Sequence, residues 1–418
     1  GVRVNSSYVP NSSKSARGEG GSVNLRNLGV GNTLTLLNGR RVVWHPTSRA
    51  DDNLVPVLTY NTNAIPVSGV ERLEVLRDGA AAIYGSDAVA GVVNTVLRNN
   101  FDGGELTLQY GLAEGTSLTE FNANAMLGHN FGEGRGNITL FADYTDRSAL
   151  KARDQDYTRS ANRTDLFAGT RFEGATSLDG RSTITPWGSF TTVGNRRVQI
   201  GTNSLTNASG QFHIQPATNP GCQIGLPGGL CMDDGTNGAA VDRNLRFDAP
   251  YAYNTDVMPS VERLNLFLTS RYEISDGVEL FGEAGFYRAV TDSFQSSTGT
   301  LSSGPIVVPA SNYWNPFGPT TLNGAANPNR IPGINAPAAG LPVTISSFNF
   351  ADVGPNLVNV KNQQFRLLGG LRFEGLGFDW ESALVYSEAS VRDRSDGISA
   401  TLLQRQLALS TPDAYNVF

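Results

Sequence analysis

The side chains that most often carry chemistry are sparse and scattered in this sequence. The three histidines, His45, His129 and His213, have none of the spacings that hold a metal. No Gly-x-Ser-x-Gly segment presents a serine nucleophile. Residues 29–31 begin like a dinucleotide-binding fingerprint, but the third glycine is missing and residues 33–37 are typical of a strand rather than a helix. We therefore predict a protein without enzymatic activity, resident metal or cofactor.

The two cysteines, Cys222 and Cys231, stand nine positions apart in a segment rich in glycine, proline and asparagine. A flexible loop gains stability from a covalent link, so this spacing favours a local disulfide made in an oxidising compartment. Two unrelated reduced thiols are the alternative, because two residues alone do not form a structural zinc site. Asp233 and Asp234 follow directly, and they are compatible with calcium binding in an external loop or with an ordinary solvated loop.

Composition narrows the class of protein. Lys and Arg total 32 and Asp and Glu total 38, so the net charge of −6 speaks against a nucleic-acid partner. Glycine contributes 47 of the 418 residues and charged residues only 17%, as expected for a chain of many turns and strands. No run of about 18 apolar residues could form a transmembrane helix. The sequence begins at Gly1 without a leader peptide, so we expect a mature or truncated chain.

The elements that position these residues fall into two regions of different periodicity. Up to about residue 100 the strands are short, and an alanine-rich stretch near Ala80 predicts one or two helical turns, which indicates a small α+β domain. After Phe101, apolar and polar residues alternate over long segments, with Phe141 an exception on a polar face. Such alternation predicts strands with one apolar and one polar face. We expect strands at 104–112, 118–131, 136–148, 261–274, 278–291, 361–373 and 377–391.

The connections between these strands alternate in length. Tight polar turns lie at 132–136, 275–277 and 374–377, whereas two long segments cover about 150–260 and 292–360. Structureless loops of that length do not fit a compact domain. Short turns on one side and long loops on the other are typical of an outer-membrane β-barrel. Seven strands are too few to close a barrel around a second domain, and bacterial barrels have an even number, so we expect a fragment.

Residues 65–98 join two apolar strand signals through a turn of small residues. Upstream lie the segments VNLRNLG at 23–29 and LTLLNGRRV at 34–42. In this order the three segments closely resemble the plug domain of TonB-dependent outer-membrane receptors. The strand pattern and the segment YWNPFG at 313–318 extend the resemblance more weakly over the rest of the chain. One departure is Asn27, where many relatives carry glycine, and it bears on the local turn geometry.

The resemblance implies a mainly β protein with a small α+β plug domain in residues 1–100. Residues 101–418 would form part of a transmembrane antiparallel β-barrel, with about 7 of 22 strands. The implied function is that of an energy-coupled importer of a scarce large solute, such as a ferric siderophore, cobalamin or an oligosaccharide. It would lie in the outer membrane of a Gram-negative bacterium. Its partners would be an inner-membrane TonB-type energy-transducing protein, outer-membrane lipid and the transported small molecule. A passive porin and an adhesin that binds through its long loops are the alternatives.

The resemblance also implies two sets of site residues. Outward-facing plug loops contact ligand in the relatives, and by position these are Val30, Gly31, Asn32, Trp44 and His45. Trp44 and His45 would stack on or chelate a ligand, or else merely pack the loop. The residues that shape the plug motif or dock it against the barrel are Arg26, Glu71, Arg72, Glu74, Arg77, Gly79, Gly85 and Gly91. The four charged residues at 71–77 would meet charges on the inner barrel wall or form a solvated face.

Overall fold

The computed structural model describes residues 2–6, 20–29, 31–50, 56–77, 79–219, 221–234, 245–248, 252–296 and 305–418. Val30 and Asp78, which belong to the segments singled out above, lie outside these ranges. The chain divides into two compact units. The first unit comprises residues 1–154, 256–294 and 357–395, and the second comprises residues 155–255, 295–356 and 396–418.

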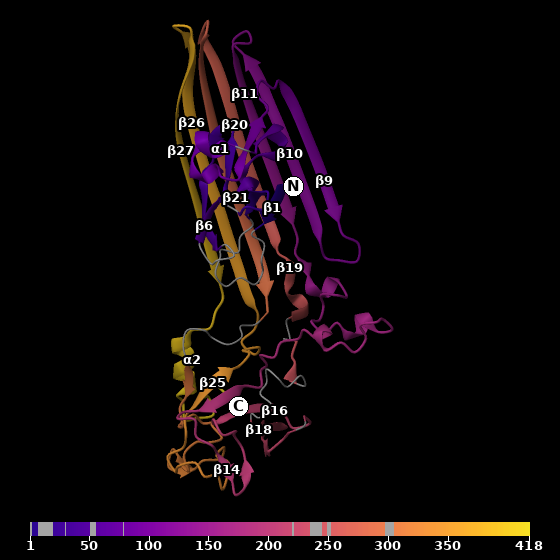
Figure 1. The fold of residues 1–418 in the computed structure, drawn as a ribbon, viewed down its shortest axis with the longest axis vertical. Coiled ribbons are helices and arrows are strands. Elements are labelled where there is room, and N and C mark those ends of the chain that lie inside the picture. Colours follow the sequence, from indigo (N-terminus) through magenta and orange to yellow (C-terminus); the bar gives the residue numbers. More distant parts are fainter. Residues whose placement is uncertain are drawn as a thin grey trace. The chain divides into compact units, whose positions relative to one another are not determined.

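The first unit contains a sheet of seven long strands in the order β27-β26-β21-β20-β11-β10-β9 (Figure 1). The strands are β9 (Gly103–Leu112), β10 (Thr119–Phe131), β11 (Gly136–Arg147), β20 (Ser260–Ser275), β21 (Val278–Gln295), β26 (Asn356–Gly375) and β27 (Phe378–Ser395). Every pair with a defined register is antiparallel. The alternation of residue types thus predicted the strands correctly, and the clearest difference is β26, which begins at Asn356 rather than at residue 361.

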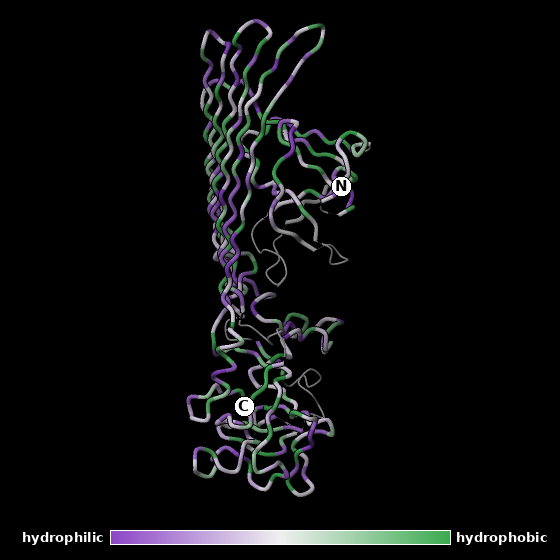
Figure 2. The backbone as a smooth tube through the Cα atoms, turned by 90° about the vertical axis from the view of Figure 1, so that its left-hand side faces the viewer, coloured by the Kyte–Doolittle hydropathy of each residue, from purple (hydrophilic) through white to green (hydrophobic). Residues whose placement is uncertain are grey.

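The two faces of this sheet differ in polarity, because successive side chains of a strand point to opposite sides. The face that we call the outer face carries large apolar side chains that are exposed: Leu106, Leu108, Tyr110, Leu112, Phe121, Leu127, Phe131, Ile138, Leu140, Leu266, Leu280, Phe286, Phe365, Leu367, Phe373, Trp380, Leu384 and Tyr386. The inner face carries mostly polar groups, among them Asn137, Thr139, Asp143, Asn265, Arg271, Glu279, Glu283, Arg366, Arg372 and Glu381. The N-terminal domain lies against the inner face (Figure 2).

The N-terminal domain is a small α+β structure, as predicted. Its elements are β1 (Val2–Ser6), β2 (Gly21–Leu25), β3 (Thr33–Leu37), β4 (Arg40–Arg41), β5 (Trp44–Ala50), β6 (Pro56–Tyr60), η1 (Thr62–Ala64), η2 (Val67–Gly69), β7 (Val70–Leu76), α1 (Ala80–Tyr84), η3 (Ser86–Ala88) and β8 (Gly91–Leu97). The central sheet has the order β4-β3-β8-β7, in which β3 runs parallel to β8 and β7 antiparallel to it. Leu34 and Leu36 of β3 pack in its core with Tyr60, Ala80 and Val92.

Two backbone positions explain why the chain turns where it does. Asn38 and Gly39 have φ angles of 51° and 78°, so the hairpin between β3 and β4 has the left-handed residues of a type I′ turn. Gly91 has a φ of 133°, and a Cβ there would lie 2.5 Å from the carbonyl oxygen of Leu76. Only glycine therefore lets β8 approach the end of β7 this closely.

The second unit is built mostly from the two long segments between the long strands. Its six-stranded sheet has the order β17-β18-β16-β13-β25-β22. The strands of this unit are β13 (Ser189–Thr192), β14 (Gln199–Ile200), β15 (Asn203–Ser204), β16 (Gln211–Pro216), β17 (Ile224–Leu226), β18 (Leu230–Asp233), β22 (Ile306–Val308), β23 (Thr321–Leu322), β24 (Ala325–Ala326) and β25 (Val343–Ser347). These segments are therefore ordered by many strands of two to six residues, which are too short to show a clear period in the sequence.

The remaining short elements complete the two units. The first unit also holds β12 (Leu150–Lys151), η4 (Ala152–Asp154) and β19 (Asp256–Met258). The second holds η5 (Thr164–Phe167), η6 (Thr176–Leu178), η8 (Ala252–Asn254) and α2 (Ala400–Leu407). Cys231 of β18 and Cys222 form a disulfide, with their Cα atoms 5.6 Å apart. None of the helices in the described part of the chain has the length and apolarity needed to cross a membrane.

Candidate docking site on the inner face of the long sheet

An apolar cluster joins the N-terminal domain to the inner face. Phe141 of β11 is fully buried there and packs with Met126 and Phe267 of the neighbouring strands and with Leu37, Ile65 and Leu97 of the N-terminal domain. Gly69 lies directly over the Phe141 ring, because a Cβ at Gly69 would come within 2.8 Å of Cδ1. The aromatic residue that interrupts the polar face of β11 is thus the one on which this domain rests.

A buried ion pair lies beside the hairpin that joins β3 and β4. Arg366 of β26 and Glu283 of β21 approach to 3.1 Å, and their side chains are only 9% and 8% exposed. The Asn38 side chain donates a hydrogen bond of 2.8 Å to Glu283 Oε1, and Arg366 Nη1 donates one of 3.1 Å to the carbonyl oxygen of Arg41. Glu283 and Arg366 therefore each have one partner on the sheet and one on the hairpin, although Arg366 Nη2 is buried without a hydrogen-bond partner among the described residues.

A more exposed charge network continues from this pair along the inner face. Arg40 of the hairpin pairs with Glu381, which also binds Arg372 at 2.7 Å. Arg372 binds Glu279 at 2.9 Å, and Arg271 reaches the same carboxylate at 3.4 Å. The guanidinium groups of Arg40 and Arg372 also lie over the ring of Phe281, at 5.1 and 4.1 Å. Positive and negative side chains thus alternate across β20, β21, β26 and β27, and the hairpin adds a further positive charge.

Of the charged residues predicted to dock the domain, Glu71, Arg72 and Glu74 form ion pairs with one another. Arg72 pairs with Glu71 at 3.4 Å and with Glu74 at 2.9 Å, and all three side chains are about half exposed. The Asn94 side chain donates to Glu74, and this bond together with Arg72 lowers the pKa of the Glu74 carboxyl. Arg72 and Glu74 line an open polar cleft of about 330 Å³ that Arg271 and Arg372 of the sheet also line. The described residues show no direct ion pair between this set and the sheet.

The other predicted motif residues shape the domain internally. Arg26 donates hydrogen bonds from Nη2 to the carbonyl oxygens of Arg77 and Ala90, at 2.7 and 3.2 Å. Asn27 has a φ of 60°, a left-handed conformation that asparagine tolerates better than most residues, so the turn forms without a glycine at this position. Gly79 and Gly85 flank α1 with φ angles of 70° and 87°. These positions hold the small-residue turn between β7 and β8.

The residues predicted to touch ligand differ in their exposure. Val30 lies outside the described residues, Gly31 is half-buried, and the exposed Asn32 donates to the carbonyl oxygen of Leu28 at 2.8 Å. Trp44 is 46% exposed, whereas His45 is only 5% exposed. They are neighbours on β5, so they point to opposite sides of the strand. Burial lowers the pKa of His45 to about 4, which keeps the imidazole neutral near pH 7.

Sequence reasoning did not single out Asn38, Arg40, Glu283 and Arg366 for this site. Charged residues on strands are common, and nothing in one sequence says which of them meet across the sheet. Phe141 did leave a signal, because it broke the alternation of β11. Within the described ranges no group of three or more histidine, cysteine or acidic side chains gathers as a metal site.

Residues 1–92 match the sequence model of a family described as the TonB-dependent Receptor Plug Domain. Among curated proteins, the chain is 28% identical over 174 residues to a ferric enterobactin receptor of Pseudomonas aeruginosa, covering 42% of this chain and 22% of that protein. It is 35% identical over 88 residues to the ferrienterobactin receptor of Escherichia coli, covering 21% of this chain and 12% of that protein.

Solved structures give a partial match of the same kind. A mutant ferric enterobactin receptor from Pseudomonas aeruginosa in complex with enterobactin aligns with a TM-score of 0.33 and 14% identity, covering 93% of this chain and 55% of that one. A siderophore receptor from Acinetobacter baumannii aligns with a TM-score of 0.30 and 15% identity, covering 94% and 44%. The chain thus spans about half the length of these structures, and the sequence matches cover a smaller share of the curated relatives.

Proposed function

The chain carries the plug domain of the TonB-dependent receptors, a family of non-enzymatic outer-membrane transporters, and on this premise we propose that it is part of a gated importer. In this proposal the long sheet is a segment of the transmembrane barrel, and the N-terminal domain closes its lumen. The observation that carries the proposal is that the plug domain docks on the polar face of a sheet whose other face is apolar and exposed.

The apolar outer face supports placement in a lipid bilayer. Leu384 is 85% exposed and Leu106 is 66% exposed, and many other large apolar side chains share this face. In water such a surface would be costly at about 25 cal/mol per Å² of apolar area. In a membrane the same side chains meet acyl chains, while the polar inner face lines a water-filled lumen.

The docking contacts support a plug that can move. The ion pairs of Glu381 with Arg40 and Arg372 are partly exposed. Each of them therefore contributes at most about 1 kcal/mol and re-forms readily in water. The buried Arg366–Glu283 pair and the cluster around Phe141 hold the plug more firmly. We propose that a TonB-type protein of the inner membrane supplies the work that breaks these contacts, after solute has bound.

For the solute we propose a ferric siderophore. The support is that several of the similar proteins are named ferric enterobactin receptors or siderophore receptors. Cobalamin and oligosaccharides are the competing solutes. The family model matches only residues 1–92, and loops in general vary more among related proteins than the strands that they connect.

Uptake in living cells tests this proposal. A strain that lacks the gene and a strain that expresses the full-length protein are compared for uptake of radiolabelled ferric siderophore, cobalamin and a labelled oligosaccharide. We expect ferric siderophore uptake only with the gene present, and loss of that uptake when the proton gradient is dissipated. Gene-dependent uptake of another solute in place of the siderophore would identify that solute as the substrate. Uptake that persists without the proton gradient would refute an energy-coupled importer.

A further inference from the structure

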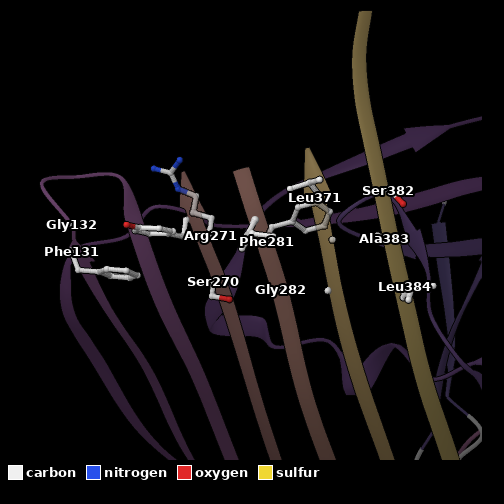
Figure 3. A pocket seen from close by; sticks show the side chains of 14 residues that line it. Phe131, Gly132, Ser270, Arg271, Phe281, Gly282, Leu371, Ser382, Ala383 and Leu384 are labelled. Carbon is white, nitrogen blue, oxygen red and sulfur yellow. The ribbon is translucent and has the colours of Figure 1, made fainter. Parts of the chain in front are cut away.

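An open groove of about 960 Å³ crosses the outer face near the end with the short turns (Figure 3). Its floor is formed by Ser270 of β20, Gly282 of β21 and Gly369 of β26. Leu371 and Leu384 line it on the side of β26 and β27, and the stacked rings of Phe131 and Tyr272 line it on the other side, with centroids 5.8 Å apart.

The groove exists because small residues meet in one row across neighbouring strands. Ser270 pairs with Gly282, and Gly369 pairs with Leu384. In the next row Tyr272 pairs with Leu280 and Leu371 with Ser382, so larger side chains rise beside the floor. A Cβ at Gly369 would meet no atom within 4 Å, and the backbone there is not left-handed. Neither crowding nor backbone geometry requires this glycine.

Glycine inside a strand is unfavourable by roughly 0.5–1 kcal/mol relative to alanine, and it leaves no side chain to pack. A row of small residues on an apolar face therefore indicates that another molecule approaches the backbone closely there. Gly282 is similar but tighter, because its Cβ would lie 3.1 Å from Ser270 Oγ. Gly369 is thus the position at which the groove can be filled without disturbing its walls.

The mouth of the groove carries charge. Arg135, in the turn between β10 and β11, lies over the Tyr272 ring at 6.0 Å from its centroid. It is exposed and has no carboxylate partner among the ion pairs of the described residues. The same turn carries the exposed Glu133. An occupant that suits this end has an anionic group for Arg135 and a cationic group for Glu133, followed by an apolar chain for the groove.

We propose that the groove binds a zwitterionic glycerophospholipid of the phosphatidylethanolamine type. One acyl chain lies along the floor of small residues, the phosphate meets the Arg135 guanidinium, and the ammonium faces Glu133. A purely anionic headgroup would bring like charge to Glu133, so the charges favour the zwitterion. This inference rests on the proposed function, because only a membrane-embedded sheet would meet such a lipid on its outer face.

Lipid retention by the full-length protein tests the inference. The protein is purified from outer membranes in mild detergent and its bound lipids are counted by native mass spectrometry, before and after addition of phosphatidylethanolamine. The variant Gly369→Leu fills the groove, and Arg135→Gln removes the cation from a solvent-exposed turn. The variant Ala125→Leu is the control, since it also introduces a leucine side chain on the outer face, but on β10 and away from the groove.

We expect the wild-type protein and Ala125→Leu to retain one phosphatidylethanolamine molecule, and Gly369→Leu and Arg135→Gln to bind it roughly tenfold more weakly. Equal retention by wild type and both groove variants would overturn the proposal, as would a preference for phosphatidylglycerol. Membrane fractionation and solute uptake distinguish failure of the lipid proposal from failure of the proposed transport function. A protein that is found in the outer membrane and imports solute but shows no specific lipid refutes the groove alone, whereas absence from the outer membrane refutes the importer.

Discussion

At the scale of single residues, Phe141 and His45 show how burial sets a role. Phe141 stands among polar neighbours on the inner face, and only the N-terminal domain removes its ring from water. His45 is only 5% exposed, and its Nδ1 atom has no hydrogen-bond partner among the described residues. The burial of both side chains therefore depends on the folded N-terminal domain, and substitution or titration of each can be measured.

Truncating Phe141 should loosen the plug. Phe141→Ala removes a fully buried ring from the cluster with Ile65 and Leu97, and such changes cost about 3–5 kcal/mol. We expect the plug of the full-length protein to become sensitive to trypsin while the sheet stays resistant. Phe286→Ala is the matched control, because Phe286 is exposed on the outer face. Equal protease resistance of Phe141→Ala and the control would mean that the cluster does not hold the plug.

Acid should weaken the plug through His45. Its pKa falls from 6.5 to about 4 on folding, so the folded state binds this proton less readily than the unfolded state. The stabilising contribution is therefore complete above about pH 6.5 and is lost as the pH falls toward 4, by about 3 kcal/mol in total.

Hydrogen exchange of β5 and β6 in the full-length protein, followed between pH 7 and pH 4, measures this loss. His45→Gln should flatten the dependence, since glutamine does not titrate. His129→Gln should leave it unchanged, because His129 is exposed on β10. A slope that survives in His45→Gln would assign the effect to another group.

At the scale of elements, the hairpin between β3 and β4 is the part of the plug that reaches the charges of the sheet. Its turn places Asn38 against Glu283 and Arg40 against Glu381, two carboxylates in different surroundings. Glu283 is almost fully buried with Arg366, whereas Glu381 is about half exposed. The same substitution at the two positions therefore separates a buried contact from an exposed one.

Glu283→Gln should destabilise docking far more than Glu381→Gln. The first leaves Arg366 buried without a counter-charge, at a cost of about 3 kcal/mol, and the second removes exposed pairs worth less than about 1 kcal/mol each. Urea denaturation of the plug in the full-length protein compares the two midpoints. Replacing both partners, as Arg366→Met with Glu283→Leu, should recover part of the loss. Equal shifts for the two single variants would contradict the assigned burial.

At the scale of the whole molecule, the proposal is that a domain blocks a lumen. The full-length protein in a planar bilayer should show no steady conductance, and deletion of residues 1–100 should open a channel. The reason is that the plug occupies the polar face that would otherwise carry water and ions. Steady conductance with the plug in place would favour a passive porin instead.

The amino-acid sequence alone determined the class of the elements in the first unit, but not that of the short strands in the second unit. Period-two alternation placed the seven long strands, and the motifs around residues 65–98 identified the plug, because local residue types dictate these features. Only the tertiary structure decided which side chains meet. Glu283 and Arg366 are 83 positions apart, and Asn38 lies 245 positions from Glu283. Contacts of that separation depend on strand order and on how a domain sits on a sheet, and no local pattern encodes either.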